Sequence, residues 1–177
     1  MPRAASRQLG AAQLIPYTTV GPARRDYVYG CSLVDPATGR GERQLVLQCD
    51  EGSDVCAVTS TVAQAIGAAP VAQGQLTGVD GVAFQTPIYS LSLYTPYGIV
   101  ANHRFWQMPL GGSIAGLIGN DVLSQGVFEE DSSGFWLAIG TAAPPASTRV
   151  ADAILLGGLL VAGAAVVIGV SLHRRAA

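Results

Sequence analysis

Histidine, cysteine and lysine are scarce in this chain of 177 residues. It has two histidines and three cysteines, and all ten of its cationic residues are arginine. With so few histidines and no CxxC pair, we expect no Cys/His zinc site. The odd number of cysteines suits a reducing compartment. We interpret the absence of lysine as genomic base bias rather than as a functional feature.

Charge is also scarce. The formal net charge is −2, charged residues make up 12% of the chain, and its longest basic cluster is Arg174-Arg175. A chain with so little positive charge is not expected to bind nucleic acid. The 22 glycines and the low charged fraction together fit a β-rich domain joined to an apolar segment.

The apolar segment is "AILLGGLLVAGAAVVIGVSL", residues 153–172, which carries no charge. As a helix it would span about 30 Å, the hydrocarbon thickness of a bilayer. A buried core helix is the alternative, but it should show a polar stripe, and this segment has none. We therefore expect a transmembrane helix at 153–172, after a linker at 142–152 with Pro144-Pro145 and before a short tail at 173–177.

The N-terminal segment, residues 1–11, has Arg3 and Arg7 but no apolar core of signal-peptide length before Pro16. We expect it to be flexible. Arg174 and Arg175 favour a cytosolic tail by the positive-inside tendency, yet translocating a five-residue tail is easier than translocating a domain without a signal. The expectation is therefore a single-pass, tail-anchored membrane protein with its domain in the cytoplasm.

Short strands are predicted between residues 12 and 141. "DYVYGCSLV" (26–34) and "RQLVLQC" (43–49) are strand candidates separated by a turn rich in Asp, Pro and Gly. "VAFQTPIYSLSLYTPYG" (82–98) has apolar residues at period two, at Val82, Phe84, Tyr89, Leu91 and Leu93. "GVFEEDSSGFWLAIG" (126–140) reads as a hairpin with its turn at 131–134.

Two short helices are predicted among these strands. In "STVAQAIGA" (60–68), Ser60 can cap the helix, and Val62, Ala65 and Ile66 lie on one side. In "NDVLSQG" (120–126), Asn120 can cap the helix and Gly126 can end it. The fold class is therefore mostly β, with one or two short helices.

Three segments in order resemble retropepsin-like aspartic proteases, the single-lobed relatives of pepsin. "VLQCDEGSDVCAVTSTVAQAIGAAP" (46–70) is similar to their active-site segment: an apolar strand, Asp-Thr/Ser-Gly, Ala/Ser-Asp, and a second apolar strand. "TGVDGVAFQTPIYSLSL" (77–93) stands where the family has its flap hairpin, and "GLIGNDVLSQGVFEED" (116–131) resembles its second signature. The resemblance covers roughly residues 45–139 and implies a single-lobe acid-protease β-barrel for residues 12–141.

The resemblance implies an aspartic endopeptidase without cofactor or metal. Such chemistry needs two carboxylates that share one proton, so that one activates water and the other donates to the peptide carbonyl. A single lobe supplies one of them, which implies a homodimer with the site on its two-fold axis. The residues implied are the catalytic Asp50; its loop, Glu51, Gly52, Ser53 and Asp54; the flap, Gly78, Val79, Asp80 and Gly81; and the supporting Leu117, Ile118, Gly119, Asn120 and Asp121.

Two positions depart from the family pattern. Glu51 replaces the Thr or Ser whose hydroxyl holds the two catalytic loops together across the dimer axis, and an ionised carboxylate has no donor for that bond. Asn120 replaces the Arg that, in viral members, pairs with the acid matching Asp54. The alternative function is therefore a catalytically inactive, membrane-tethered dimerisation or peptide-binding module of the same fold.

Other patterns have simpler interpretations. "GGSIA" (111–115) lacks the closing glycine of a serine nucleophile elbow and has only His103 as a base. "NHRFWQM" (102–108) is interpreted as a loop or strand edge whose Trp106 packs on the lobe. Cys49 and Cys56, on either side of the Asp50 loop, are expected to be small buried hydrophobic residues.

Overall fold

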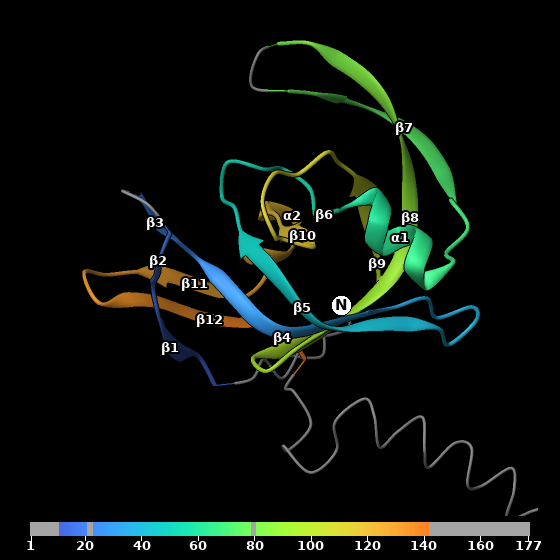
Figure 1. Cartoon of the computed structure of the whole chain (residues 1–177). Coiled ribbons are helices and arrows are strands. Elements are labelled where there is room, and N and C mark those ends of the chain that lie inside the picture. The colour runs from blue at the N-terminus through green and yellow to red at the C-terminus, as the bar shows by residue number, and fades with distance from the viewer. Residues whose placement is uncertain (1–10, 21–22, 79–80, 142–177) are drawn as a thin grey trace, which may run out of the picture. The chain divides into compact units, whose positions relative to one another are not determined.

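The computed structural model describes residues 11–20, 23–78 and 81–141 (Figure 1). Among these residues, no helix combines the length and the apolar character needed to cross a membrane. The flexible segment predicted at 1–11 falls almost entirely outside the described residues, as do the predicted linker, membrane helix and tail at 142–177. These remain predictions.

Strands dominate the described part of the chain, and two short helices, α1 (Ser60–Ile66) and α2 (Asn120–Leu123), accompany them. The predicted class, mostly β with short helices, is confirmed. In chain order the strands are β1 (Gln13–Pro16), β2 (Thr18–Val20), β3 (Ala23–Arg25), β4 (Tyr27–Val34), β5 (Gly41–Cys49), β6 (Ala57–Val58), β7 (Ala72–Thr77), β8 (Ala83–Thr95), β9 (Gly98–Gln107), β10 (Gly116–Ile118), β11 (Val127–Glu130) and β12 (Gly134–Gly140).

Six strands close into a barrel in the order β9-β6-β10-β5-β4-β8, and β8 pairs back onto β9. The short strand β10 lies between β5 and β6, parallel to β5 and antiparallel to β6. Because β5 and β6 follow each other in the chain, the loop that joins them, residues 50–56, must pass over the end of β10. This crossing positions the candidate site.

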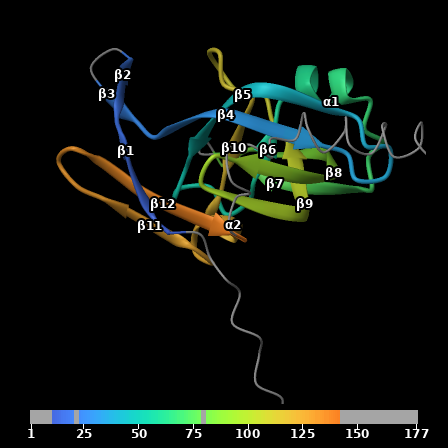
Figure 2. The ribbon, with the colours of Figure 1, turned by 90° about the horizontal axis from the view of Figure 1, so that it is seen from below.

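β1, β7, β11 and β12 extend the sheet beyond the barrel, whereas β2 and β3 form a separate two-stranded sheet (Figure 2). β12 continues from the barrel through a short parallel pairing with β9, and it also pairs antiparallel with β1 and with β11. The turn of the β11–β12 hairpin lies at Asp131–Gly134, as predicted, where the Asp131 backbone N–H donates to the Gly134 carbonyl. The N-terminal and C-terminal strands of the domain are therefore neighbours.

The core is built from alternate residues of the long strands. Leu47, Leu91, Leu93 and Phe105 are fully buried, and Tyr89 is nearly so, which confirms that the predicted apolar residues of β8 face the core over this stretch, although Ser92 between the two leucines is buried as well. The pattern does not bury the two earlier residues, Val82 and Phe84, which are 60% and 37% exposed. They belong to the end of the β7–β8 hairpin, which extends away from the core.

The helix caps differ from the sequence prediction. Thr59, not Ser60, is the N-cap of α1, and its side chain accepts from the Val62 backbone N–H. The buried residues of α1 are Ala63 and Ile66, whereas Ala65 is exposed. For α2, Gly119 is the N-cap without a side-chain bond, Asn120 is the first helical residue, and Ser124 rather than Gly126 ends the helix.

Candidate active site

Asp50 directly follows the last residue of β5 and begins a tight turn. Its backbone N–H donates to the carbonyl of Ile118 at 3.0 Å, and its carbonyl accepts from the Ser53 N–H at 3.1 Å. Oδ1 of the half-buried side chain accepts from the Gly52 N–H at 3.0 Å, an Asx-type turn. The carboxyl group is therefore held at the tip of a strand by bonds to its own loop and to β10.

The loop after Asp50 rests on the segment that contains the predicted supporting residues. Leu117 and Ile118 are buried in β10 beneath it. The Asn120 N–H donates to the Ser53 carbonyl at 2.8 Å. A Cβ atom on Gly119 would lie 2.3 Å from the carbonyl oxygen of Val55, so only glycine allows this approach. The Asp50 loop and the segment that contains the supporting residues are remote in sequence, but they are in direct contact in the fold.

Glu51 and Asp54 are the exposed acids of this loop. The Asn120 side-chain Nδ2 donates to the Glu51 carbonyl oxygen at 3.4 Å, so the side chain of Asn120 also contacts the loop. Between the two acids, the Ser53 hydroxyl donates to the Val55 carbonyl at 2.8 Å. The carboxylate of Glu51 therefore projects from a loop whose backbone is tied down.

A second acidic pair lies near this turn, which the sequence analysis did not identify. The Asp26 carbonyl accepts from the Cys49 N–H at 2.9 Å, one residue before Asp50. Partial burial, together with a hydrogen bond and charge repulsion from Glu130, raises the pKa of Asp26 from 3.8 to about 7. The charges of Glu51 and Asp50 add to this rise. Carboxylates therefore gather at this end of β5.

The predicted flap corresponds to the turn between β7 and β8, an antiparallel hairpin that arches over the side of the barrel where the Asp50 loop lies (Figure 1). Val79 and Asp80 lie outside the described residues. Gly78 and Gly81 flank them: the Gly81 N–H donates to the Gly78 carbonyl, and Gly81 has a φ of 77°, which favours glycine. The positive φ explains the glycine at position 81.

The base of the hairpin is packed against Trp106 of β9. A Cβ atom on Gly74 of β7 would lie 2.2 Å from Cζ3 of the Trp106 ring, so the ring lies directly against the glycine. The predicted strand edge at 102–108 is thus largely part of β9, and its Trp106 packs on the hairpin.

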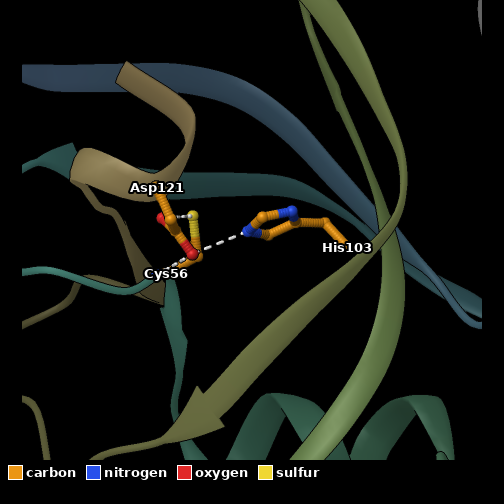
Figure 3. A group of neighbouring side chains, drawn as sticks. All are labelled: Cys56, His103 and Asp121. Atoms are coloured by element: carbon orange, nitrogen blue, oxygen red, sulfur yellow. Dashed lines mark hydrogen bonds and ion pairs between the residues drawn. The ribbon is translucent and has the colours of Figure 1, made fainter. Parts of the chain in front are cut away.

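A cluster of three side chains lies behind the Asp50 loop (Figure 3). The Nε2 atom of His103 is 2.7 Å from Oδ2 of Asp121. The Cys56 thiol lies 3.2 Å from Oδ1 of Asp121, and the Cys56 backbone N–H donates to Oδ2 at 3.2 Å. Sequence reasoning missed this cluster, although it named Asp121 as supporting, because the three residues come from separate segments.

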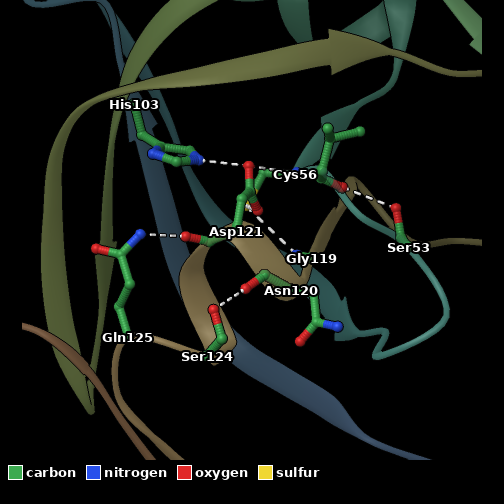
Figure 4. A network of polar contacts seen from close by, with 9 residues as sticks. Ser53, Cys56, His103, Gly119, Asn120, Asp121, Ser124 and Gln125 are labelled. Carbon is green, nitrogen blue, oxygen red and sulfur yellow. Dashed lines mark hydrogen bonds and ion pairs between the residues drawn. The ribbon is translucent and has the colours of Figure 1, made fainter.

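The cluster is part of a larger polar network (Figure 4). The Gly119 N–H points to the Cys56 sulfur at 3.4 Å, the Gln125 side chain donates to the Asp121 carbonyl, and the Ser124 hydroxyl donates to the Asn120 carbonyl. Partial burial opposes ionisation of Asp121, but the hydrogen bonds from His103 and Cys56 outweigh it and lower the pKa of Asp121. Burial, followed by the Asp121 charge, raises the pKa of the Cys56 thiol.

All three cysteines are buried and free. Cys49 and Cys56, the two cysteines predicted to be small buried hydrophobic residues, belong to the core cluster, as does Cys31. Cys56 is also buried, but its sulfur takes part in the polar network described above.

The sequence matches no protein-family model, and no curated protein matches it. Among solved structures, it is similar to the "retropepsin-like aspartic protease from Rickettsia conorii". The match has 16% sequence identity and a TM-score of 0.41, and it covers 71% of this chain and 100% of the other. The chemistry of the site must therefore be derived from this chain's own residues.

Proposed function

We propose that this chain is an aspartic endopeptidase that hydrolyses peptide bonds as a homodimer, with Asp50 from each copy at the shared site. The observation that carries the proposal is the position of Asp50. Its carboxyl group is half-buried at the tip of β5, in a turn fixed by the bonds to Ile118, Gly52 and Ser53. Catalytic groups need such rigid support, because small displacements are costly in rate.

The proposed mechanism needs two copies of this turn. Two Asp50 carboxyl groups that face each other would hold one proton between them, since like charges in contact cannot both ionise. The ionised Asp50 would take a proton from water as it attacks the peptide carbonyl, and the protonated Asp50 would donate to the carbonyl oxygen. Breakdown of the resulting tetrahedral intermediate, with a proton passing to the leaving nitrogen, releases the two products.

The β7–β8 hairpin has the proposed role of closing over the substrate. Two of its side chains, Val82 and Phe84, are large, apolar and exposed. Exposed apolar groups on a hairpin beside an active site are suited to contact an extended peptide. Contact with substrate would account for these two large apolar side chains, which are not part of the core.

The membrane segment predicted at 153–172 has a part in this proposal. A tail anchor would confine the domains to a surface and raise their effective concentration, whatever the contacts between the anchors. A lobe that pairs weakly on its own could then form the dimer. We accordingly propose a membrane-anchored peptidase.

Glu51 favours a second candidate, an inactive dimerisation or peptide-binding module. Glu51 is exposed and directly follows Asp50, so in the proposed dimer two Glu51 carboxylates would approach each other across the axis. Two ionised groups there repel each other and cannot provide the hydroxyl donor that would lock the loops. A domain with this defect could still bind peptides without cleaving them.

The two candidates are separated by cleavage assays with the full chain in detergent, between pH 4 and pH 8, using a mixed peptide library. Sedimentation under the same conditions measures the fraction of dimer. For a peptidase, Asp50→Asn should lower cleavage by about 10²–10⁴-fold, while Glu129→Gln, which removes an exposed acid of β11, should leave it unchanged. A wild-type sample that is dimeric and binds peptides but cleaves none would support the inactive module instead.

A further inference from the structure

The Cys56, His103 and Asp121 side chains offer three different kinds of metal ligand at one place. The Cys56 sulfur, a ring nitrogen of His103 and a carboxylate oxygen of Asp121 all lie within 4.8 Å of one another. We propose that these three residues bind a zinc ion. This proposal is independent of the peptidase function and departs from the sequence-based expectation that the chain has no metal site.

Two of the three spacings between the ligand groups are close to those of a tetrahedral zinc site. Zinc–ligand bonds of about 2.0–2.3 Å and tetrahedral angles place neighbouring ligand atoms about 3.3–3.6 Å apart. The sulfur of Cys56 is 3.2 Å from Oδ1 of Asp121, and Nε2 of His103 is 2.7 Å from Oδ2. Separating the imidazole from the carboxylate by less than 1 Å would bring this pair to the tetrahedral spacing, while the Cys56 and His103 ligand atoms lie within 4.8 Å of each other.

The backbone already holds the three residues in place. β6, which follows Cys56, pairs with β9, which carries His103, and the Trp106 N–H donates to the Cys56 carbonyl at 2.9 Å. The Cys56 N–H donates in turn to Asp121 of α2. The His103 ring is fixed by an edge-to-face contact with Phe105, with ring centroids 5.8 Å apart. Little conformational freedom would be lost on binding.

The surroundings of the ligands resemble the second shell of a metal centre. The Gly119 N–H points at the Cys56 sulfur, a contact that favours the thiolate required for zinc binding. Gln125 donates to the backbone carbonyl of Asp121. Outer contacts of this kind orient ligands and tune their basicity.

The donor set selects the class of metal. A thiolate, an imidazole and a carboxylate are the ligands of Zn²⁺, whereas Mg²⁺ and Ca²⁺ prefer oxygen alone. The side chains of His103 and Asp121 are 21% and 25% exposed, so an ion has a path from solvent. Three protein ligands leave the fourth position for water.

Binding would replace hydrogen bonds by metal bonds. The Cys56 thiol would release its proton to solvent and bind through sulfur, and His103 would bind through Nε2 with its remaining proton on Nδ1. The ion would then join β6, β9 and α2 immediately behind the Asp50 loop. Because only the folded chain holds the three ligands together, zinc should stabilise the fold.

The test uses the full chain in detergent, reduced and stripped of metal, titrated with Co²⁺ as a spectroscopic substitute for Zn²⁺. We expect one equivalent to produce visible d–d bands and a thiolate-to-cobalt charge-transfer band, both removed by added Zn²⁺. Cys56→Ala should abolish the charge-transfer band. Cys31→Ala, which removes another fully buried free thiol, should retain it. His103→Ala should weaken zinc binding by more than the roughly 10–100-fold that outer-shell changes cost.

X-ray absorption at the zinc edge of the wild-type protein decides the matter even if a variant fails to fold. One sulfur at about 2.3 Å, with nitrogen and oxygen at about 2.0–2.2 Å, is the expected first shell. A first shell of oxygen and nitrogen alone, or the absence of a charge-transfer band at saturating Co²⁺, would overturn the proposal. So would equal loss of the band in Cys31→Ala and Cys56→Ala.

Discussion

The backbone N–H of Asp50 donates to the carbonyl oxygen of Ile118 at 3.0 Å. This bond joins the end of β5 to the end of β10, the strand that lies between β5 and β6. The position of the candidate catalytic acid is therefore set by a segment that follows it at long range in the sequence. Substitutions in the residues that support the loop should therefore alter the position of Asp50 through this hydrogen bond.

Gly119 also packs tightly against this loop, and we expect Gly119→Ala to be strongly destabilising. The added methyl group would lie 2.3 Å from the Val55 carbonyl oxygen and 2.4 Å from its carbon, both of which are backbone atoms that cannot rotate away. Overpacking of this kind typically costs about 1–3 kcal/mol, occasionally more. Urea unfolding followed by circular dichroism measures the change, and peptide cleavage should fall with it.

Gly111→Ala is the matched control for Gly119→Ala. No heavy atom lies within 4 Å of a Cβ atom at Gly111, and its φ is not positive. Its free energy of unfolding should stay within about 0.5 kcal/mol of the wild type. Equal unfolding midpoints for the two variants would show that the loop yields to the methyl group.

His103 and Asp121 should be energetically coupled even without metal. In the presence of a chelator, a double-mutant cycle with His103→Ala and Asp121→Ala should give a coupling of about 0.5–1.5 kcal/mol at neutral pH. Asp121→Ala should cost more than His103→Ala, about 1–3 kcal/mol, because it also removes the acceptor of the Cys56 N–H. Additive single changes would contradict the coupling.

Asp26 should make the fold less stable as pH rises. Its pKa is raised from 3.8 to about 7 in the folded chain, so the folded state binds the proton more tightly than the unfolded state. The stability from this protonation is fully present below about pH 4 and is lost as pH rises through about 7. Thermal unfolding between pH 4 and pH 8 should show this decline, and Asp26→Asn should reduce it.

Glu129→Gln is the control for Asp26→Asn, because it removes one negative charge from an exposed position of β11. It should keep the pH dependence of the wild type. If both variants reduce the decline equally, the effect comes from the net charge of the domain and not from the Asp26–Glu130 pair.

Local patterns in the sequence predicted the strands and the place of Asp50 at a strand tip, because a strand that packs on a core has a visible period. Tyr89, Leu91 and Leu93 show this period and are buried. Val82 and Phe84 continue the same period in the sequence, but they lie in the part of the hairpin that extends away from the core and are exposed. Thr59 and Ser60 are both able to cap α1, so the sequence could not distinguish them.

Contacts between remote segments could not be predicted in this way. β10 lies between β5 and β6 because it pairs with both strands, and the sequence of its three residues does not indicate which strands they pair with. The meeting of Cys56, His103 and Asp121 depends on that insertion. A lone histidine in an ordinary strand gave no signal until the topology placed a carboxylate beside it.

Glu51 should make the proposed dimer tighter in acid. When protonated, two Glu51 side chains can hydrogen-bond to each other across the axis, and when ionised they repel. Because repulsion in the proposed dimer favours proton uptake by the pair, sedimentation of the full chain in detergent should show stronger association at pH 5 than at pH 8. Glu51→Gln should show a smaller difference between the two pH values, the remainder coming from the proton shared by the Asp50 pair. Glu51→Thr, which supplies a hydroxyl, should associate more strongly than the wild type at pH 8.

Asp26→Asn, studied by the same sedimentation measurements, distinguishes the contribution of Asp26 to the pH dependence of association from that of Glu51. Asp26 is affected by the charges of Asp50 and Glu51, so it could influence the association indirectly. A pH dependence that persists undiminished in Glu51→Gln but disappears in Asp26→Asn would assign the effect to Asp26 and refute the role given to Glu51.

Gly74→Ala should loosen the hairpin without unfolding the barrel. The added methyl group would lie 2.2 Å from Cζ3 of Trp106 and 2.9 Å from Cδ1 of Ile88. These are side-chain atoms, and the half-buried indole can turn outward. In a Trp136→Phe background, which removes the other tryptophan of the chain, the fluorescence of Trp106 should shift to longer wavelength. If the hairpin closes over substrate, KM should rise more than kcat falls, while an unchanged emission spectrum would mean that the ring does not rest on Gly74.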